Sequence, residues 1–239
     1  MPQAFAFSPH LDDAAFSCGG TLARLAQTGW EVTICTAFTA SVPEPTGFAL
    51  DCQLDKGLPA SVDYMALRRA EDAAACMALG ARPLWLPFAE APHRGYESVA
   101  ALFGAPANTD GIATQLAEAL RPLLAGAELV LAPQAIGGHV DHVRAVEALR
   151  MTVRPDVPIL WWTDWPYASR PESHPVRPFA SWFESLPVHE ICGDESARRD
   201  ACAAYASQLG FQFGGMADLE AALAAAGPCE AFRLQGSLP

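Results

Sequence analysis

The chain has 239 residues, of which 51% are hydrophobic and 18% are charged, a composition typical of a folded globular protein. Its formal net charge of −12 argues against a nucleic-acid backbone or an anionic membrane as the main partner. No apolar run approaches the ~20 residues that span a bilayer, and no basic segment precedes an apolar one at the start, so we expect neither a membrane span nor a secretory signal.

Hydrophobic runs alternate with helix-like segments along the first two thirds of the chain. β-Branched and apolar runs predict strands at residues 3–7, 31–38, 83–88, 128–132 and 157–163. The intervening segments predict helices at residues 14–27, 62–79, 111–124 and 139–151. Three stretches rich in proline, glycine and polar residues predict long loops at 40–61, 89–110 and 165–181.

The last third is expected to add a strand at 188–192, helices at 195–208 and 217–226, and a strand at 230–234. The alternation predicts an α/β fold in which helices cover both faces of a mostly parallel sheet. No linker divides the chain, so residues 1–239 are expected to form a single domain. The seven cysteines are scattered without a CxxC pair, which indicates no disulfide framework and no cysteine zinc site. We expect most of them to be small core residues of a cytoplasmic protein.

The first polar turn, Ser8-Pro9-His10-Leu11-Asp12-Asp13, comes directly after the first predicted strand. A turn at the carboxyl end of a parallel strand is where open α/β sheets build their sites. His10 and Asp13 offer a nitrogen and an oxygen ligand to a divalent metal, and Asp12 is held nearby without having to bind it. The alternative is that Asp12 or Asp13 simply caps the next helix.

A second turn, Gly137-Gly138-His139-Val140-Asp141-His142, also follows a hydrophobic run and opens a helix. His139 and His142 are three residues apart and share a helix face. Asp141 points elsewhere, where it can hold the ring nitrogen of a neighbouring histidine. A histidine alone at such a position is usually structural, but three of the six histidines fall in these two turns, each near an aspartate. The joint pattern predicts a metal site.

The best set of ligands is His10, Asp13 and His142, because three protein ligands and an open position are typical of catalytic zinc. Asp12 then remains as a free carboxylate beside the open position, and His139 as a free imidazole on the other side. Zinc can acidify a water, a carboxylate can accept its proton, and an imidazolium or the metal can stabilise the oxygen of an attacked carbonyl. These parts suit the hydrolysis of an amide or an ester.

Taken together, the two turns resemble the motifs of the PIG-L/LmbE-like family of zinc-dependent deacetylases. The family's first motif, Pro-His-Pro-Asp-Asp followed by an acidic residue, stands here as PHLDDA at residues 9–14. Leu11 replaces the middle proline and Ala14 the trailing acid, which removes neither a ligand nor the presumed base but leaves the substrate open. The second motif, His-x-Asp-His, is intact at residues 139–142.

The resemblance implies a Rossmann-like three-layer α/β/α sandwich with a mostly parallel sheet. It also implies Zn²⁺, with Fe²⁺ as the alternative, on the same three ligands. Asp12 would be the general base, His139 the electrostatic stabiliser or acid, and Asp141 the orienting partner of His139.

Residues 67–80 match a third feature of the family, an Arg-x-x-Glu at the start of a helix that ends in Leu-Gly. Arg68 and Glu71 fit it, so Arg68 is a candidate substrate contact. The alternative for Arg68 is an exposed helix residue paired with Glu71 or Asp72.

The loops expected at the catalytic edge supply candidate pocket walls. Arg94 is a second candidate substrate contact, and Tyr96, Trp165 and Tyr167 offer aromatic faces. Aromatic faces and an arginine together would suit a sugar carrying an anionic group. The alternative for Trp165 and Tyr167 is that they pack the loops against the body of the protein. The remaining histidines, which we expect to be surface or structural residues, are His93, His174 and His189.

The preferred hypothesis is a metal-dependent hydrolase that removes an acetyl group from an N-acetylglucosamine-type sugar or glycoconjugate. An amidase for a larger amide of a thiol or sugar conjugate is the alternative enzyme. An inactive metal- or sugar-binding relative is less expected, since Asp12 and His139 are both kept. The first turn also lacks the GxGxxG of a nucleotide-binding protein. The sequence leaves open the exact substrate and the formation of a homo-oligomer.

Overall fold

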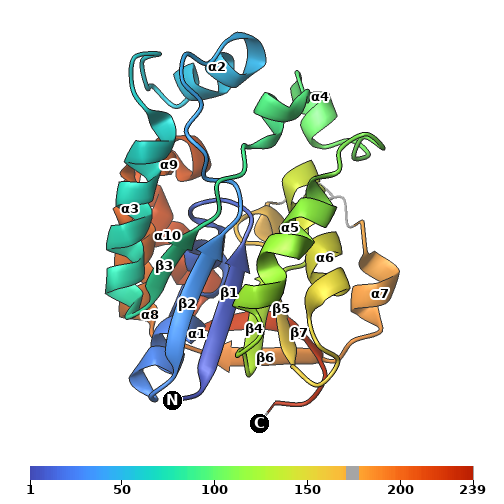
Figure 1. Ribbon diagram of the computed structural model, residues 1–239. Helices are drawn as coiled ribbons and strands as arrows, with labels where there is room; N and C mark the ends of the chain where they lie inside the picture. The colour runs from blue at the N-terminus through green and yellow to red at the C-terminus, as the bar shows by residue number, and fades with distance from the viewer. Residues whose placement is uncertain (171–177, 239) are drawn as a thin grey trace.

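The computed structural model describes residues 1–170 and 178–238 (Figure 1). The strands in this part of the chain are β1 (Gln3–Ser8), β2 (Glu31–Thr36), β3 (Arg82–Trp85), β4 (Leu129–Pro133), β5 (Ile159–Trp162), β6 (Val188–Cys192) and β7 (Cys229–Gln235). They form one sheet in the order β3-β2-β1-β4-β5-β7-β6. Strands β1 to β5 run parallel to one another, whereas β7 pairs antiparallel with both β5 and β6.

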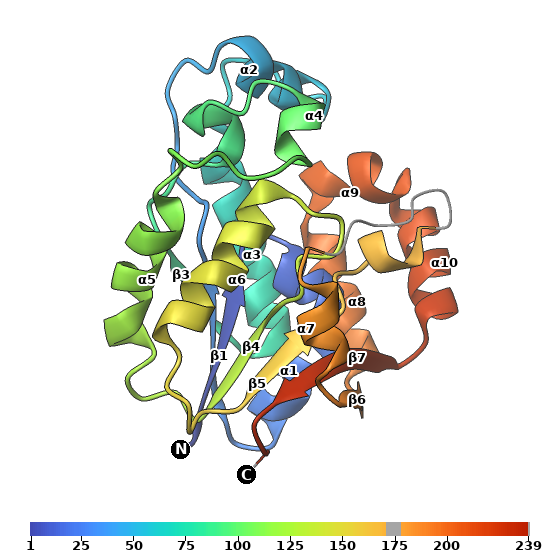
Figure 2. The ribbon, with the colours of Figure 1, turned by 90° about the vertical axis from the view of Figure 1, so that its right-hand side faces the viewer.

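Helices cover both faces of this sheet (Figures 1 and 2). They are α1 (Asp13–Gln27), α2 (Gly47–Leu54), α3 (Tyr64–Leu79), α4 (Val99–Leu102), α5 (Ile112–Leu123), α6 (Val140–Thr152), α7 (Ala180–Glu184), α8 (Glu195–Ala204), α9 (Ala206–Phe213) and α10 (Met216–Ala226), with 3₁₀ turns at Ala91–Arg94 and Tyr167–Ser169. The architecture confirms the expected three-layer α/β/α sandwich. None of the described helices combines the length and the apolar composition needed to cross a lipid bilayer.

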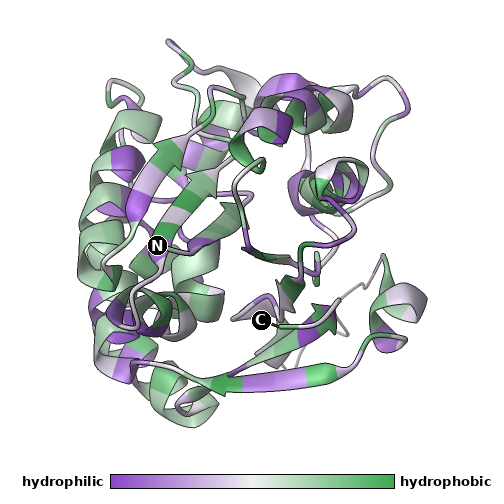
Figure 3. Ribbon diagram, turned by 60° about the horizontal axis from the view of Figure 1, so that its bottom comes forward, coloured by the Kyte–Doolittle hydropathy of each residue, from purple (hydrophilic) through white to green (hydrophobic). Residues whose placement is uncertain are grey.

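The core divides into two layers because alternate residues of a strand point to opposite faces of the sheet. Ala4 and Ala6 of β1 pack in the layer of α1, α3 and α8, while Phe5 and Phe7 pack in the layer of α5 and α6. Hydrophobic residues, green in Figure 3, therefore predominate along several of the strands. Strands covered on both faces have this composition.

The main differences from the expected elements fall in the predicted loops. The stretch 40–61 contains α2, and the stretch 89–110 contains a 3₁₀ turn and α4. These helices are short, and within α2 only Gln53 is buried. Their sequences therefore show no apolar periodicity from which a helix could be predicted. The helix expected at 195–208 is two helices, α8 and α9. The predicted loop 165–181 lies in part at 171–177, outside the described residues.

The strand order creates a switch point between β1 and β4. From β1 the chain proceeds outward through β2 to β3 and then returns to place β4 on the other side of β1. Ala6 pairs with Leu131, so the two strands end at the same edge. Open α/β sheets bind their ligands at such a point. The turns that follow β1 and β4 are the two polar motifs of the sequence.

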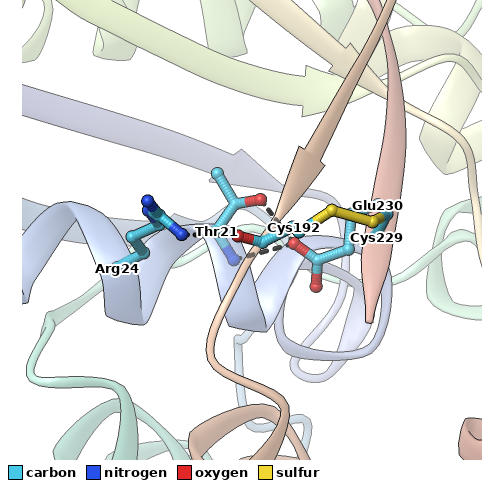
Figure 4. Close-up of a disulfide and its surroundings, with 5 residues drawn as sticks. All are labelled: Thr21, Arg24, Cys192, Cys229 and Glu230. Carbon is cyan, nitrogen blue, oxygen red and sulfur yellow. Dashed lines mark hydrogen bonds between the residues drawn. A yellow bond between two sulfur atoms is a disulfide. The ribbon is translucent and has the colours of Figure 1, made fainter. Parts of the chain in front are cut away.

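One disulfide corrects the expectation drawn from the cysteine spacing. Cys192 at the end of β6 lies opposite Cys229 at the start of β7, and the two are bonded (Figure 4). They are 37 residues apart in the chain, and antiparallel pairing rather than local spacing brings them together. As expected for small core residues, four of the free cysteines are buried, namely Cys18, Cys35, Cys76 and Cys202.

The residue after this disulfide holds helix α1 in place. The helix is interrupted at Cys18, where φ is −146°, so a second helical segment starts after it. The backbone N–H group of Gly20 donates to the buried carboxylate of Glu230 at 2.9 Å. The N–H of Thr21 donates to the same carboxylate at 2.7 Å (Figure 4). Arg198 lies 3.4 Å from the same carboxylate. Glu230 thus satisfies the free amides of a helix start, where a negative charge is also favoured by the helix dipole.

The close approach of the β6–α8 connection to α1 requires a glycine at position 193. A Cβ at Gly193 would stand 2.1 Å from the carbonyl carbon of Gly20. We predict that Gly193→Ala lowers the free energy of unfolding by about 3 kcal/mol, because the backbones must separate. The control is Gly210→Ala, which meets no atom within 4 Å and should be neutral or stabilising by up to ~1 kcal/mol. Denaturant unfolding checks both, and a Gly193→Ala protein as stable as wild type would contradict the close packing.

Candidate metal centre

The turns after β1 and β4 bring three side chains to one point at the edge of the sheet. His10 and Asp13 come from the first turn, and His142 comes from the first turn of α6. The His142 Nε2 atom lies 3.2 Å from Asp13 Oδ2, and the His10 Nδ1 atom lies 3.5 Å from the same oxygen. Gly137, with φ of 102°, permits the sharp turn that precedes α6. The structure thus brings together the three side chains proposed as metal ligands.

The charges at this point indicate that the site favours a cation. Burial disfavours an imidazolium at His10, but hydrogen bonds with Asp13 and Asp141 outweigh it and raise the His10 pKa to about 9. Burial is likewise outweighed by Asp13 at His142, whose pKa is raised, and the same contacts hold the pKa of Asp13 low. One oxygen and two nitrogen donors lie within 4.8 Å of one another. This donor set fits a divalent transition metal.

Each histidine is held from behind by a carboxylate. His10 Nε2 lies 2.9 Å from Asp141 Oδ2, and His142 Nδ1 lies 3.1 Å from Asp164 Oδ1. These contacts leave His10 Nδ1 and His142 Nε2 facing Asp13, as in the carboxylate–histidine pairs that orient metal ligands. The other oxygen of Asp164 accepts hydrogen bonds from the backbone N–H groups of Gln134 and Ile136, at 3.1 and 3.0 Å.

Asp164 was missed in the sequence, although a signal for it was present. It lies two residues after β5, the strand that pairs with β4, and is 1% exposed. The rule that identified the first two turns, a polar residue directly after a parallel strand, applies to it equally.

Asp141 differs from the role implied by the family resemblance. Its carboxylate holds His10, and it lies 3.9 Å from His139 Nδ1, beyond hydrogen-bond distance. Instead, His139 Nδ1 accepts a hydrogen bond of 3.2 Å from the backbone N–H of Asp141, because His139 caps the start of α6. Burial lowers the pKa of His139 to about 3, so the ring is neutral. With Nδ1 occupied as an acceptor, the single proton resides on Nε2.

Asp12 stands beside the three ligands in a strained backbone conformation. Its φ is 142° with ψ of −33°, a region that residues other than glycine rarely occupy. Its Oδ2 atom lies 3.1 Å from Arg68 Nη2. Burial raises the pKa of Asp12 to about 7 even though the Arg68 charge opposes the shift. A carboxylate with a pKa near neutrality suits general acid–base catalysis.

Arg68 is buried rather than exposed, so the alternative pairing with Glu71 or Asp72 is wrong. It is 3% exposed, lies 3.1 Å from Glu90 Oε1, and donates to the carbonyl oxygen of Leu11. Arg68 lines the cavity beside the site, so its side chain is within reach of a molecule bound there. Its position shows that it fixes Asp12 and the turn after β1.

Arg94, the other candidate substrate contact, lies behind the site. Its guanidinium is 2.8 Å from Asp141 Oδ1 and 3.1 Å from Asp110 Oδ2. Tyr96 donates to Asp110 at 2.8 Å and is 5% exposed. Both residues therefore support the layer behind the ligands rather than the wall of the cavity.

Trp165 and Tyr167, the two aromatic residues of the loop after β5, occupy different environments. Trp165 packs against Phe16 and Phe213 in the core, as the packing alternative expected. Tyr167 lines the cavity, with its ring at 90° to that of His142. Of the three remaining histidines, His93 and His189 are partly exposed, and His174 lies outside the described residues.

A cavity of about 260 Å³ opens over the ligands. Helices α2 and α4 stand above the carboxyl ends of the strands (Figures 1 and 2), and the three predicted loops all contribute to its walls. The wall residues outside the ligand cluster include Phe48, Lys56, Tyr64, Glu90, Val99, Leu102, Phe103, Tyr167, Gln208, Phe211 and Gln212. Its size approaches that of small-molecule sites, and apolar walls with a few polar groups are typical of them.

Known proteins resemble this chain both in sequence and in fold. A profile of the PIG-L family, described as GlcNAc-PI de-N-acetylase, matches residues 5–153. The chain is 38% identical over 176 residues to the 2'-N-acetylparomamine deacetylase of Streptomyces fradiae, covering 71% of this chain and 59% of that protein.

Two solved structures extend the comparison to nearly the whole chain. A deacetylase of teicoplanin biosynthesis is 26% identical, with a TM-score of 0.79 and 98% of both chains covered. The N,N'-diacetylchitobiose deacetylase from Pyrococcus horikoshii, 17% identical with a TM-score of 0.53, covers 97% of this chain and 83% of its own, and shares the fold.

The contact between Asp164 and His142 generates a prediction on metal affinity. In Asp164→Asn the amide would offer an N–H to His142 Nδ1 and favour the tautomer with the proton on Nε2, the atom that faces Asp13. We expect the affinity for Zn²⁺ to fall about 10- to 100-fold, measured by competition with a chromophoric chelator. The control, Asp156→Asn, changes a carboxylate whose side chain is 73% exposed and should leave the affinity unchanged. Equal affinities in the two variants would contradict the role of Asp164.

Proposed function

Because the chain belongs to the PIG-L family, we propose that it is a metal-dependent hydrolase that removes the acetyl group from an N-acetylglucosamine-type sugar or glycoconjugate. The convergence of His10, Asp13 and His142 beside the carboxylate of Asp12, which is not one of the three proposed ligands, carries this proposal. The similarity to 2'-N-acetylparomamine deacetylase and to a deacetylase of teicoplanin biosynthesis supports the substrate class. We further propose that residues 1–239 act as a single deacetylase domain.

Zn²⁺ is the proposed metal, with Fe²⁺ as the alternative, and His10, Asp13 and His142 are the side chains that would hold it. When bound, such an ion polarises a carbonyl and makes a water acidic. The side chains behind the ligands keep them in the correct orientation: Asp141 fixes the His10 ring and Asp164 the His142 ring.

Asp12 carries the proton in the proposed reaction. Among the described residues Arg68 is its one charged partner within 4 Å, through Oδ2, so Oδ1 is available for proton transfer. Asp12 accepts a proton from the attacking water as the water oxygen adds to the acetyl carbon. It then returns the proton to the amine nitrogen as the C–N bond breaks, which yields acetate and the free amine.

His139 is placed to assist as a neutral donor. Its proton lies on Nε2, and its ring lies 5.0 Å from that of His10 and lines the cavity. A donor aimed at the developing negative oxygen lowers the barrier without a charge of its own. Stabilisation by an imidazolium would require a protonated His139, which its lowered pKa disfavours.

The rim of the cavity favours a substrate larger than a single sugar. Val99, Phe103 and Phe211 line the cavity and are 63%, 44% and 58% exposed. An apolar group attached to the sugar would cover them. The same observation keeps an amidase for a larger amide as the alternative, which releases a larger acid in place of acetate.

A cytoplasmic location and the formation of a homo-oligomer stay predictions.

The role of Asp12 is tested by Asp12→Asn. We expect acetate release to fall by about 10²- to 10⁴-fold, because the amide cannot accept the proton, while Zn²⁺ affinity and far-ultraviolet circular dichroism stay close to wild type. The control is Asp51→Asn, an exposed aspartate on α2. Full activity in Asp12→Asn would show that another group is the base.

Removal of the metal tests the site as a whole. Dialysis against a strong chelator should abolish acetate release from N-acetylglucosamine or N,N'-diacetylchitobiose, and one equivalent of Zn²⁺ should restore it. Elemental analysis would verify the metal content before each assay. Turnover by protein that contains less than one-hundredth of an equivalent of metal would contradict a metal-dependent reaction.

A further inference from the structure

Helix α9 presents two glutamines to the cavity, one helical turn apart. Gln208 and Gln212 both line it, as residues at this spacing share one face of a helix. Each lies beside a tyrosine that also lines the cavity: Tyr64 at the start of α3 and Tyr167 after β5. The family profile ends at residue 153, so α9 and Tyr167 belong to a part of the chain that the profile does not describe.

The hydrogen bond between Gln212 and Tyr167 has a fixed direction. Arg170 donates to the Gln212 Oε1 atom at 2.7 Å, which places the carbonyl oxygen of the amide on the Arg170 side. The amide nitrogen therefore faces Tyr167, and Nε2 donates to the phenolic oxygen at 3.0 Å. Because Tyr167 acts as the acceptor in this bond, its own O–H proton is left for another partner.

The orientation of Gln208 is fixed in the same way. Ser207 donates its hydroxyl proton to Glu71 Oε2 at 2.7 Å, so its oxygen accepts from Gln208 Nε2 at 2.8 Å. The carbonyl oxygen of Gln208 then points away from Ser207. No donor among the described residues forms a hydrogen bond with this oxygen, and Gln208 as a residue is 2% exposed. Because Gln208 lines the cavity, its oxygen can accept a hydrogen bond from a ligand that binds there.

We propose that Tyr167 is a specificity-determining residue that donates its O–H to an oxygen of the sugar, with Gln212 as its positioning residue and Gln208 Oε1 as a neighbouring acceptor. The inference rests on the proposed sugar substrate. A sugar hydroxyl both donates and accepts, so a wall that offers one donor, Tyr167 O–H, and one acceptor, Gln208 Oε1, matches a polyhydroxylated ring. A site built to bind a hydroxyl rejects analogues that lack it.

A purely structural role would give a different result. Gln212 could serve only to tie the loop of Tyr167 to α9, and then loss of the phenolic hydroxyl would alter stability but not sugar binding. Two substitutions separate these roles. Tyr167→Phe keeps the ring and removes the donor. Gln212→Glu keeps the link to Arg170 as an ion pair but supplies a carboxylate that accepts the Tyr167 proton.

The experiment measures the Kd of N-acetylglucosamine by NMR titration of Zn²⁺-loaded protein in an Asp12→Asn background, which prevents turnover. We expect Tyr167→Phe to weaken binding about tenfold, the size of one neutral hydrogen bond. Gln212→Glu should weaken it to a similar extent, and the double variant should be no weaker than Tyr167→Phe, because both changes remove the same donor.

The matched control is Tyr205→Phe, which removes a hydroxyl that donates to Asp72 at 2.7 Å outside the cavity. It should lower the melting temperature and leave the Kd unchanged. A Tyr167→Phe or Gln212→Glu protein that binds within twofold of its parent would overturn the inference. Acetate release by the wild-type protein is scored separately, so sugar binding without acetate release would overturn the proposed function and leave the assignment of Tyr167 standing.

Discussion

The site depends on one oxygen atom, Oδ2 of Asp13, which two imidazoles face at once. His10 lies three residues before it and His142 is 129 residues later, and only the adjacency of β1 and β4 brings the second imidazole into reach. Because β1 and β4 are parallel neighbours, the turns that follow them lie close together at the same edge of the sheet. A metal-binding geometry thus follows from the strand order, and side chains of the right type at the ends of two strands complete it.

Buried charges of opposite sign surround this centre in a continuous network. Asp141 is held by Arg94, Asp12 by Arg68, and each carboxylate in turn faces a histidine or the cavity. A buried charge without a partner is strongly destabilising, so these pairs must be present together. The network explains why Arg94 lies behind the ligands: its guanidinium neutralises Asp141 and Asp110, which would otherwise be buried charges without a cation.

The sequence predicted those parts of the site that lie within short segments. His10, Asp12, Asp13, His139 and His142 stand in two turns whose composition marks the ends of strands, and the sheet type follows from the alternation of strands and helices. Three features were not predicted, for different reasons. Asp164 does follow a predicted strand, but its contact with His142 forms only across neighbouring strands, and Cys192 meets Cys229 only through antiparallel register. Helix α2 is too short to show an apolar face. The direction of a loop side chain such as Arg94 is likewise decided by the charges it finds nearby.

The backbone of Asp12 has a consequence for how this protein would respond to artificial selection. Its φ of 142° costs about 1–3 kcal/mol in a residue with a Cβ atom, a cost that glycine would largely avoid. Laboratory evolution that rewards heat resistance alone would therefore enrich glycine at this position and discard the carboxylate. Thermostable descendants obtained without a parallel screen for turnover would include folded proteins that have lost their chemistry.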